Sequence, residues 1–378
     1  MNFVVQSTVL ASHLQSIGRV INSKNSLPIL DNYLFELEGN NLTITASDLE
    51  TTFITTIQID NSEGDITLAV EAKKINEIVK ELGNQPLTFN IDSETLNIDI
   101  VTETGKFSIK GVEGIDFPKV PGLKEESKVS LNLKSEILFH GINSTLFATA
   151  DDELRPVMNG VFFEINVDNL TFVASDAHKL VKYSRKEVNS EIASSFILPK
   201  KPANLLKNIL SKDDTEVMIN FDGKNAHFTL PKYKLVCRLV EGNFPNYSSV
   251  IPTENPNVLE IDRLEFYNTL KRVSIFSNQA SNLVRLHINA NQLKISAQDI
   301  DFSVSAHEHV NCSYDGDELE IGFKSIFLME ILQNISTTNV SMEFSDPTRA
   351  GIVKPHEKDK ENENEDVLML LMPMMINA

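Results

Sequence analysis

A threefold internal repeat constrains this chain more than any other feature of its sequence. The segments LTITASD, LTFVASD and LKISAQD occupy residues 42–48, 170–176 and 293–299, and their closing aspartates lie 128 and 123 residues apart. The residues that lead into each segment are also similar. Three related segments at nearly constant spacing indicate one structural unit of roughly 125 residues that is used three times.

Each unit carries two helical patterns, in which apolar residues recur three and four positions apart. The first pattern of the three units is formed by Leu10, Leu14, Ile17 and Ile21, by Leu138 and Ile142, and by Phe266, Leu270 and Val273. The second is formed by Ile75, Ile78, Val79 and Leu82, by Leu205, Leu206, Ile209 and Leu210, and by Leu328, Ile331, Leu332 and Ile335. Two helices are therefore expected in each unit.

Short alternating runs lie between the helical patterns, such as LNIDIVT at residues 96–102 and FSIKG at residues 107–111. Because Asn, Asp and Gly bound these runs, they predict antiparallel strands and hairpins. Polar, turn-rich stretches at residues 120–128 and 251–257 predict the domain boundaries. The expected fold class is α+β, with repeated domains at residues 1–128, 129–256 and 257–378, each made of two helices packed on antiparallel sheets.

Composition excludes several classes of protein. The two cysteines, Cys237 and Cys312, exclude a disulfide framework and a multi-cysteine zinc site, and they favour a reducing cytoplasm. The first residues do not resemble a signal peptide, and no run of 18 apolar residues predicts a transmembrane helix. With 34 basic and 53 acidic residues, the formal net charge is -19, so DNA could be bound only through a local basic surface.

The sequence contains no recognised catalytic or phosphate-binding motif, and its eight histidines are scattered singly, so no cofactor or metal is expected. The one tempting constellation is Ser175, Asp176 and His178, which could form part of a hydrolytic dyad. The same position recurs in the other two units without a histidine. A turn in which the aspartate caps backbone amides is therefore favoured over catalysis.

Basic residues recur on or beside the expected helices: Arg19 and Lys24; Lys73, Lys74 and Lys80; Lys200, Lys201, Lys207 and Lys212; Lys271 and Arg272. For any single one of them a solvated helix face is the simpler interpretation. Their recurrence in a threefold repeat favours one shared positive surface. No base-reading motif accompanies them, so this surface would contact phosphates without sequence preference.

Several motifs connect the chain to a known family. They are LPIL (27–30), TASDLE (45–50), NG (159–160), SDAHKL (175–180), EGNFPNYSSVIP (241–252), NQLKISAQD (291–299), LEIGF (319–323) and LMPM (371–374). Over essentially its whole length the sequence resembles the bacterial DNA polymerase III beta subunit family, the replicative sliding clamps. The resemblance implies three DNA-clamp domains per chain, and two chains joined head to tail in a six-domain ring whose helices line the central hole.

The resemblance also implies a function and partners. The chain would encircle duplex DNA as a noncatalytic processivity factor for DNA replication. Any nucleotidyltransferase or 3′–5′ exonuclease activity would belong to the assembled holoenzyme. The implied partners are double-stranded DNA, a second copy of the chain, the replicative polymerase catalytic subunit, the clamp loader, repair polymerases and ligase. These proteins would insert short linear motifs into an apolar groove.

The family's site residues map onto three sets of positions. Those near DNA are Lys24, Lys73, Lys200 and Lys201. Those of the partner-peptide groove are Met158, Ser175, Ala177, His178, Lys179, Leu180, Pro245, Val250, Phe327, Thr348, Leu370, Met372, Pro373 and Met374. At the dimer interface Ile275 and Phe276 would face Lys106 and Ile109 of the other chain, although an ordinary helix-end core is the simpler interpretation of the apolar pair.

Three departures from the family pattern concern the groove. Ser281 replaces an aromatic residue, Met375 and Ile376 replace a terminal Arg-Leu pair and precede Asn377 and Ala378, and the acidic segment 355–366 is longer than usual. That segment is expected to be a solvated loop. The simpler interpretation of the terminal apolar run is an edge strand with buried side chains, and the run could serve both roles, with one face packed and the other lining the groove. Two other functions stay open: a protein-interaction scaffold that uses the groove without DNA, and an enzyme that uses Asp176 and His178.

Overall fold

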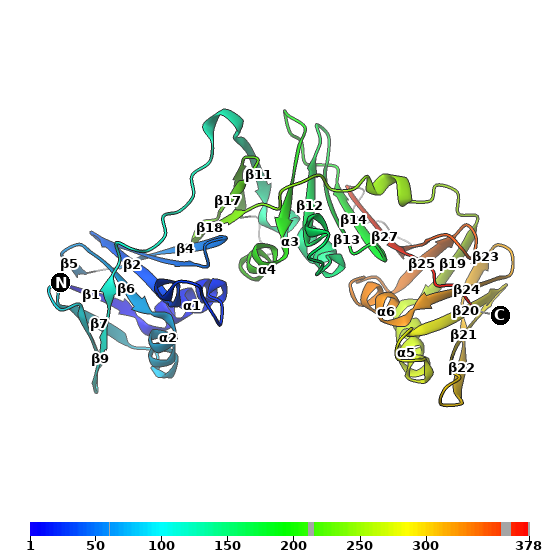
Figure 1. Ribbon diagram of the computed structural model, residues 1–378, viewed down its shortest axis with the longest axis horizontal. Helices are drawn as coiled ribbons and strands as arrows, with labels where there is room; N and C mark the ends of the chain where they lie inside the picture. Colours follow the sequence, from blue (N-terminus) through cyan, green and yellow to red (C-terminus); the bar gives the residue numbers. More distant parts are fainter. Residues whose placement is uncertain (60, 211–214, 357–363, 377–378) are drawn as a thin grey trace. The chain divides into compact units, whose positions relative to one another are not determined.

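The computed structural model describes residues 1–59, 61–210, 215–356 and 364–376. Within these residues the same order of elements occurs three times: a strand, a helix, a run of strands, a second helix and further strands (Figure 1). In chain order the first repeat consists of β1 (Asn2–Gln6), α1 (Ser7–Ile17), β2 (Asn32–Glu38), β3 (Asn41–Ser47), β4 (Thr51–Gln58), β5 (Ser62–Glu63), β6 (Ile66–Glu71), α2 (Ala72–Glu81), β7 (Pro86–Ile91), β8 (Asn97–Val101), β9 (Lys106–Lys110) and β10 (Val112–Glu113).

The other two repeats follow the same plan. The second consists of β11 (Val129–Lys134), α3 (Ser135–Thr145), β12 (Gly160–Ile165), β13 (Leu170–Ser175), β14 (Lys179–Arg185), β15 (Ser194–Pro199), α4 (Lys200–Ile209), β16 (Glu216–Phe221), β17 (Asn225–Thr229) and β18 (Tyr233–Arg238). The third consists of β19 (Asn257–Asp262), α5 (Arg263–Val273), β20 (Leu283–Asn289), β21 (Gln292–Asp299), β22 (Val304–Asn311), β23 (Ser313–Asp315), β24 (Leu319–Lys324), α6 (Ser325–Gln333), β25 (Asn339–Phe344), β26 (Gly351–His356) and β27 (Glu365–Leu371). The predicted two helices per repeat are confirmed.

The predicted apolar face of α1 is buried as far as Ile17, but Ile21 lies beyond the helix. A single 3-10 turn follows α1, and the hydroxyl of Tyr33 donates a hydrogen bond to the carbonyl of Leu14 at 3.0 Å. A Cβ on Gly18 would lie only 2.2 Å from that hydroxyl, so the close approach requires glycine. Burial raises the pKa of Tyr33 to about 12. The phenol therefore stays neutral and helps to satisfy the carbonyls at the end of the helix.

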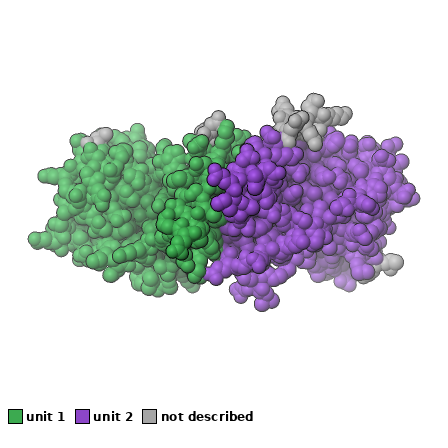
Figure 2. All heavy atoms as spheres, turned by 90° about the horizontal axis from the view of Figure 1, so that it is seen from above, with its two compact units in different colours: residues 1–139, 201–239 green, residues 140–200, 240–378 purple. Residues whose placement is uncertain are grey.

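The chain forms two compact units, residues 1–139 with 201–239 and residues 140–200 with 240–378 (Figure 2). The second repeat is divided between them. In the first unit α1 contacts α2, and in the second α5 contacts α6 (Figure 1). Because these units follow contacts rather than repeats, the boundaries after residues 128 and 256 stay a prediction.

Each unit contains one joint at which strands of two repeats pair. In the first unit β4 pairs with β18, which gives the sheet order β10-β6-β2-β3-β4-β18-β17-β16-β11. In the second unit β14 pairs with β27, which gives the order β15-β12-β13-β14-β27-β26-β25-β19-β23. The interpretation of the terminal run as an edge strand is therefore wrong, because β27 lies between β14 and β26. Residues 369–371 are buried in this interior strand, as the same interpretation required.

Two smaller sheets end in strands of special interest. Their orders are β5-β1-β7-β8-β9 in the first unit and β22-β21-β20-β24 in the second. Among the described residues, β9 and β22 each have a single strand neighbour. Pro355 and His356 of the predicted acidic loop belong to β26, and Glu365 and Asp366 belong to β27. Residues 357–363 lie outside the described part of the chain.

Candidate partner-binding groove and basic surface

A tight turn between β13 and β14 holds Asp176. Its Oδ1 accepts hydrogen bonds from the backbone N–H groups of His178 and Lys179, both at 2.9 Å. Ala177 adopts φ = 74° within the turn. The carboxylate thus binds the backbone of His178, whereas the imidazole stacks on Phe327 with the ring centroids 5.7 Å apart. The predicted aspartate-capped turn is confirmed, and its geometry does not fit a hydrolytic dyad, because the imidazole is engaged with a phenyl ring.

The other two repeats use their aspartates in the same way. Asp48 Oδ1 accepts from the backbone N–H of Glu50 at 3.1 Å and of Thr51 at 2.7 Å. Asp299 Oδ1 accepts from the backbone N–H of Asp301 at 3.0 Å. The repeated aspartate is therefore a structural capping residue, and the repeat explains why it recurs without a histidine.

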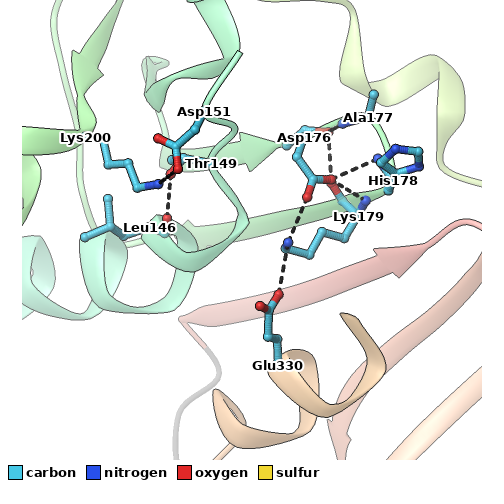
Figure 3. A network of polar contacts seen from close by, with 10 residues as sticks. Leu146, Thr149, Asp151, Asp176, Ala177, His178, Lys179, Lys200 and Glu330 are labelled. Atoms are coloured by element: carbon cyan, nitrogen blue, oxygen red, sulfur yellow. Dashed lines mark hydrogen bonds and ion pairs between the residues drawn. The ribbon is translucent and has the colours of Figure 1, made fainter. Parts of the chain in front are cut away.

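Lys179 joins this turn to α6 (Figure 3). Its side chain is only 5% exposed, and Nζ lies 2.8 Å from Asp176 Oδ2 and 3.0 Å from Glu330 Oε2. The same ammonium lies 4.4 Å from the centroid of the Phe327 ring. A buried ammonium is tolerated when carboxylates compensate it, and here two do so. The network fixes Phe327 relative to β14, and the sequence had assigned both residues to the groove.

A small apolar cluster lies beside this network. Leu180 on β14 pairs directly with Leu370 on β27, and both are almost fully buried. With Val173 and Ala350 they form a cluster separate from the main core of the unit. Partly buried hydrophobic side chains pack against it: Phe162, Phe244, Tyr247, Ile251 and Leu368. Leu180 and Leu370, two predicted groove residues, thus belong to one apolar floor.

The chain after β27 is held next to the same turn. Met372 donates its backbone N–H to the carbonyl of His178 at 2.8 Å, and Met374 donates to the carbonyl of Gly322 at 2.8 Å. A Cβ on Gly322 would lie 2.9 Å from the Met374 carbonyl oxygen, so a larger residue would displace the tail. Met372 remains 42% exposed. Flexible thioethers beside an apolar floor form a surface that can adapt to different ligands.

The segment 241–251 is pinned to β12 by two aromatic residues that the sequence analysis did not assign. Phe244 stacks on Phe162 with the ring centroids 4.7 Å apart. The Tyr247 hydroxyl donates to Glu164 Oε2 at 2.5 Å, and burial together with this carboxylate raises the pKa of Tyr247. Both aromatics lie in the motif EGNFPNYSSVIP, so the signal was present in the sequence. What was missing was the identity of the surface that they contact.

The basic residues differ in how they are engaged. Lys24 and Lys73 are exposed, whereas Lys200 Nζ lies 2.6 Å from Asp151 (Figure 3). Lys201 Nζ donates to the carbonyl of Val20 at 2.6 Å and to Asp48 Oδ2 at 2.5 Å. Lys201 therefore binds the first repeat within its own chain. Lys212 lies outside the described residues.

Comparison with known proteins identifies the family. Models for the N-terminal, central and C-terminal domains of the DNA polymerase III beta subunit match residues 1–121, 132–246 and 248–375. The chain is 30% identical to the beta sliding clamp of Pseudomonas aeruginosa, with 100% of both chains covered. This chain belongs to the DNA polymerase III beta subunit family. The resemblance inferred from the sequence motifs is confirmed.

Other comparisons agree with this family. The beta sliding clamp of Escherichia coli K12 is 27% identical over 92% of this chain and 93% of that protein. The crystal structure of the Pseudomonas aeruginosa sliding clamp bound to griselimycin superimposes with a TM-score of 0.93, at 27% identity and with 100% of both chains covered. A DNA polymerase III beta subunit from Thermotoga maritima gives a TM-score of 0.89 at 25% identity, with both chains fully covered. The predicted fold of three clamp domains is confirmed.

The structure joins only part of the groove set implied by the beta subunit family. Direct contacts connect the residues from 175 to 180 with Phe327, Leu370 and Met372, as described above. Six others lie in the same compact unit without such a contact to them. Met158 precedes β12, Pro245 and Val250 lie on the segment 241–251, and Thr348 donates to Asp346. Pro373 and Met374 follow Met372, and Met374 is bonded to Gly322. This statement covers the described residues only.

The interface positions implied by the beta subunit family are exposed in the single chain. Ile275 is 76% and Phe276 37% exposed, so Ile275 is not a core residue, contrary to the simpler interpretation. On the edge strand β9, Lys106 pairs with Asp99 at 2.8 Å and Phe107 is 39% exposed. Hydrogen bonds from Lys106 and Ser108 lower the pKa of Asp99. Apolar and polar side chains thus alternate along a strand that has one strand neighbour within the described part of the chain.

The predicted departures lie at identifiable places. Ser281 is part of the turn before β20, where its Oγ accepts from the backbone N–H of Leu283 at 3.4 Å. Met375 is 91% exposed, and residues 377 and 378 lie outside the described chain. No helix among the described residues has the length and apolar character needed to span a membrane. Within the same residues, no group of three or more His, Cys, Asp or Glu side chains is arranged to hold a metal ion.

Proposed function

We propose that this chain is a sliding clamp: a noncatalytic processivity factor that encircles duplex DNA and tethers the replicative polymerase. Its relatives of similar length in Pseudomonas aeruginosa and Escherichia coli are beta sliding clamps. Catalytic activities of the polymerase would reside in other subunits of the assembly. We expect the protein to act in the cytoplasm, and the domain starts at residues 129 and 257 are supported by β11 and β19, which begin there.

The observation that carries the proposal is the reuse of one strand joint. In each repeat one strand follows the capped aspartate turn (β4, β14 and β22), and another is the third strand after the second helix (β9, β18 and β27). Within the chain β4 pairs with β18 and β14 pairs with β27. The remaining members of the two sets, β22 and β9, each have one open edge in the described chain. Pairing between copies would use these edges and close a ring.

The two strand joints within the chain also predict the register in which β9 of one copy would pair with β22 of another. In each repeat the residue before the turn aspartate pairs across its hairpin, and these partners are Thr52, Leu180 and Ser305. The positions immediately before the partners are therefore equivalent: Thr51, Lys179 and Val304. Thr51 lies opposite Cys237, and Lys179 lies opposite Leu371.

The position equivalent to Cys237 and Leu371 in the first repeat is Ile109. All three residues lie on the third strand after the second helix of their repeat and pair with the start of the preceding strand, at Ala226, Gly351 and Ile98. The same rule therefore places Ile109 of one copy opposite Val304 of the other. Phe107 then lies opposite Ala306, and Ser108 lies opposite Ser305.

This register is chemically consistent. Phe107 and Ile109 pair with the buried residues Ile100 and Ile98, so they share the core face of their sheet. Ala306 packs against the core of the third repeat, so it also lies on the core face. A slip by one residue would place apolar side chains opposite polar ones. Ile275, just after α5, would extend this apolar seam.

The DNA-binding part of the proposal rests on charge placement. Lys24, Lys73 and Lys200 would contact the phosphates of an encircled duplex, and Lys201 would add charge only indirectly because it is bound to Asp48. A duplex carries about one negative charge per 1.7 Å of its axis. A ring holds DNA by enclosing it, so a few weak contacts suffice and do not oppose sliding. The formal net charge of -19 would disfavour DNA on other surfaces.

The groove set would receive short apolar motifs of the replicative polymerase, the clamp loader, repair polymerases and ligase. The floor formed by Leu180 and Leu370, the exposed Met372 and the fixed Phe327 ring supports this part of the proposal. The full proposed set is Met158, Ser175, Ala177, His178, Lys179, Leu180, Pro245, Val250, Phe327, Thr348, Leu370, Met372, Pro373 and Met374.

Retention on plasmid DNA tests the proposal. After loader-driven assembly, the protein should remain on closed circular plasmid through gel filtration and should be lost when a restriction enzyme linearises the plasmid. A protein that merely adheres to DNA would stay on both forms. A scaffold that uses the groove without DNA would stay on neither form, and either result would reject the clamp.

A further inference from the structure

The sheet β22-β21-β20-β24 has one face that the core does not use. Along β20 the alternate residues Val284, Leu286 and Ile288 are fully buried. The residues between them point to the opposite face, where Arg285 pairs with Ser296, and Ser296 pairs with His307. A basic residue, a hydroxyl and an imidazole therefore form one row across three strands on the face away from the core.

A pocket of about 370 Å³ lies over this row. Its basic lining residues are Arg285, Lys294 and His307, and its apolar lining includes Leu283, Ile300 and Met375. No carboxylate occurs among the described residues that line it. That is unusual for a chain with 53 acidic and 34 basic residues. Pockets that hold small molecules span about 300–1,000 Å³, so this one has room for a compact organic ligand.

We propose that this pocket binds a small organic anion, with a phosphate or carboxylate against the basic row and an apolar or planar body against Ile300 and Met375. Guanidinium and ammonium groups match oxyanions, and the hydroxyls of Ser296 and Ser305 add donors. Ile300 is 78% and Met375 91% exposed, so a ligand body that covers them would remove apolar surface from water. Every ligand of this kind has an oxyanion joined to an apolar or planar group.

Several acidic residues lie near the pocket without lining it. His287, on the same face as Arg285, lies 2.6 Å from Glu318. Glu308 lies on the other face of β22 and binds Arg272 at 2.6 Å. Asp299 caps the turn that follows β21 and accepts from Asn278 at 3.3 Å. Glu320 pairs with His287 across β20 and β24 and so shares the face of Arg285, but it does not line the pocket.

The pocket is distinct from the partner groove and does not depend on the ring. The residues proposed for the groove lie mainly on β14, β27 and α6, whereas the pocket lies over β20, β21 and β22. Strand pairing at the proposed seam would use the backbone edge of β22, while His307 projects from the sheet face. Ligand binding should therefore occur in the single chain as well as in the dimer.

Isothermal titration calorimetry on the full chain tests the pocket with four probes. Adenosine diphosphate combines a phosphate with a planar body, and octanoate combines a carboxylate with an apolar body. Pyrophosphate presents the anion alone, and adenosine presents the body alone. We expect saturable binding of one combined probe, at least about tenfold tighter than that of pyrophosphate or of adenosine. Which combined probe binds identifies the anion. Absence of saturable binding by both combined probes would overturn the proposal.

Matched variants locate the binding. Lys294→Gln and His307→Asn should each weaken the bound probe by about tenfold or more. His309→Asn changes an imidazole on the same strand and face outside the pocket lining, and Lys271→Gln removes a lysine from α5; both should stay within about twofold of the parent. Equal losses in all four variants would reject the pocket in favour of diffuse charge. An Ile275→Ala background should keep the binding, so a failed ring and a failed pocket give different results.

Discussion

Truncating Ile275 to alanine should weaken the ring without unfolding the chain. The side chain is 76% exposed in the single chain, so its removal costs little folding free energy. At the seam those atoms would be buried against the first repeat of the other copy. Ile→Ala removes three carbons at about 0.8 kcal/mol each, which is about 2 kcal/mol per seam. A ring of two chains has two seams, so the loss is about 4 kcal/mol and raises the dimer dissociation constant about 1,000-fold.

Sedimentation velocity over a dilution series measures this change directly. The control is Ile115→Ala, because Ile115 is also highly exposed (86%) and lies outside the proposed seam. Both variants should remain folded by circular dichroism, whereas only Ile275→Ala should lower the thermal midpoint, because dimerisation stabilises the folded state. Adding Phe276→Ala should weaken the dimer further, by less than the first substitution, since Phe276 is already 63% covered in one chain (37% exposed). An undiminished dimer for Ile275→Ala would refute the assignment of this residue to the seam.

Four further predictions follow from the same structure. A chain with Ser108→Cys and Ser305→Cys should form a disulfide between two copies on oxidation, because directly opposed residues of antiparallel strands lie about 4.5–5.5 Å apart. The control chain with Ser108→Cys and Ala306→Cys should not cross-link, and equal yields of the two on a nonreducing gel would reject the register. Truncation after Leu371 should abolish partner-peptide binding in fluorescence polarisation and leave the dimer intact, and an unchanged affinity would remove the tail from the groove. Burial and Lys232 lower the pKa of His13 in the folded chain, so the unfolded chain binds one more proton at low pH. The free energy of unfolding should therefore fall as the pH drops below about 6.5, by at most about 1.4 kcal/mol per pH unit. His13→Asn should flatten this part of the stability curve, which denaturant titration at several pH values measures. Lys73→Met should raise the dimer dissociation constant by about twofold to tenfold, whereas Lys80→Met should not change it. Equal dissociation constants for the two variants in sedimentation would show that Lys73 makes no contact at the seam.

The repeat made most of the fold predictable from the sequence. A helical period recurring in three units fixed the number and type of the helices, and the turn at Asp176 could be predicted because Asp48 and Asp299 share its position without a histidine. The end of α1 was less accessible. Ile21 continues the apolar period, but the phenol of Tyr33, which is distant in sequence, packs against Gly18 and ends the helix earlier.

The site was predictable in its residues and less so in their contacts. Sequence similarity named Lys179 and Phe327, but it could not indicate that the ammonium is buried between two carboxylates, because Glu330 lies 151 residues further along the chain. The terminal run looked like an edge strand because its sequence contains no partner information. Its partner, β14, belongs to another repeat. Such long-range pairing is decided by tertiary packing rather than by local pattern.

The behaviour of Lys201 limits how much of the basic surface can serve DNA. Lys73 and Lys201 are each the second residue of the second helix in their repeats, and Lys201 clamps the Asp48 turn at an internal joint. By the same equivalence, Lys73 would meet the Asp299 turn of another copy at the seam. A lysine at this position of the repeat would therefore bind a carboxylate at a strand joint, and its charge would be only partly available to DNA phosphates. Since Lys200 is also paired, with Asp151, the net attraction for phosphates should be modest. A weak attraction is what a ring needs if enclosure, rather than affinity, keeps it on the duplex while it slides.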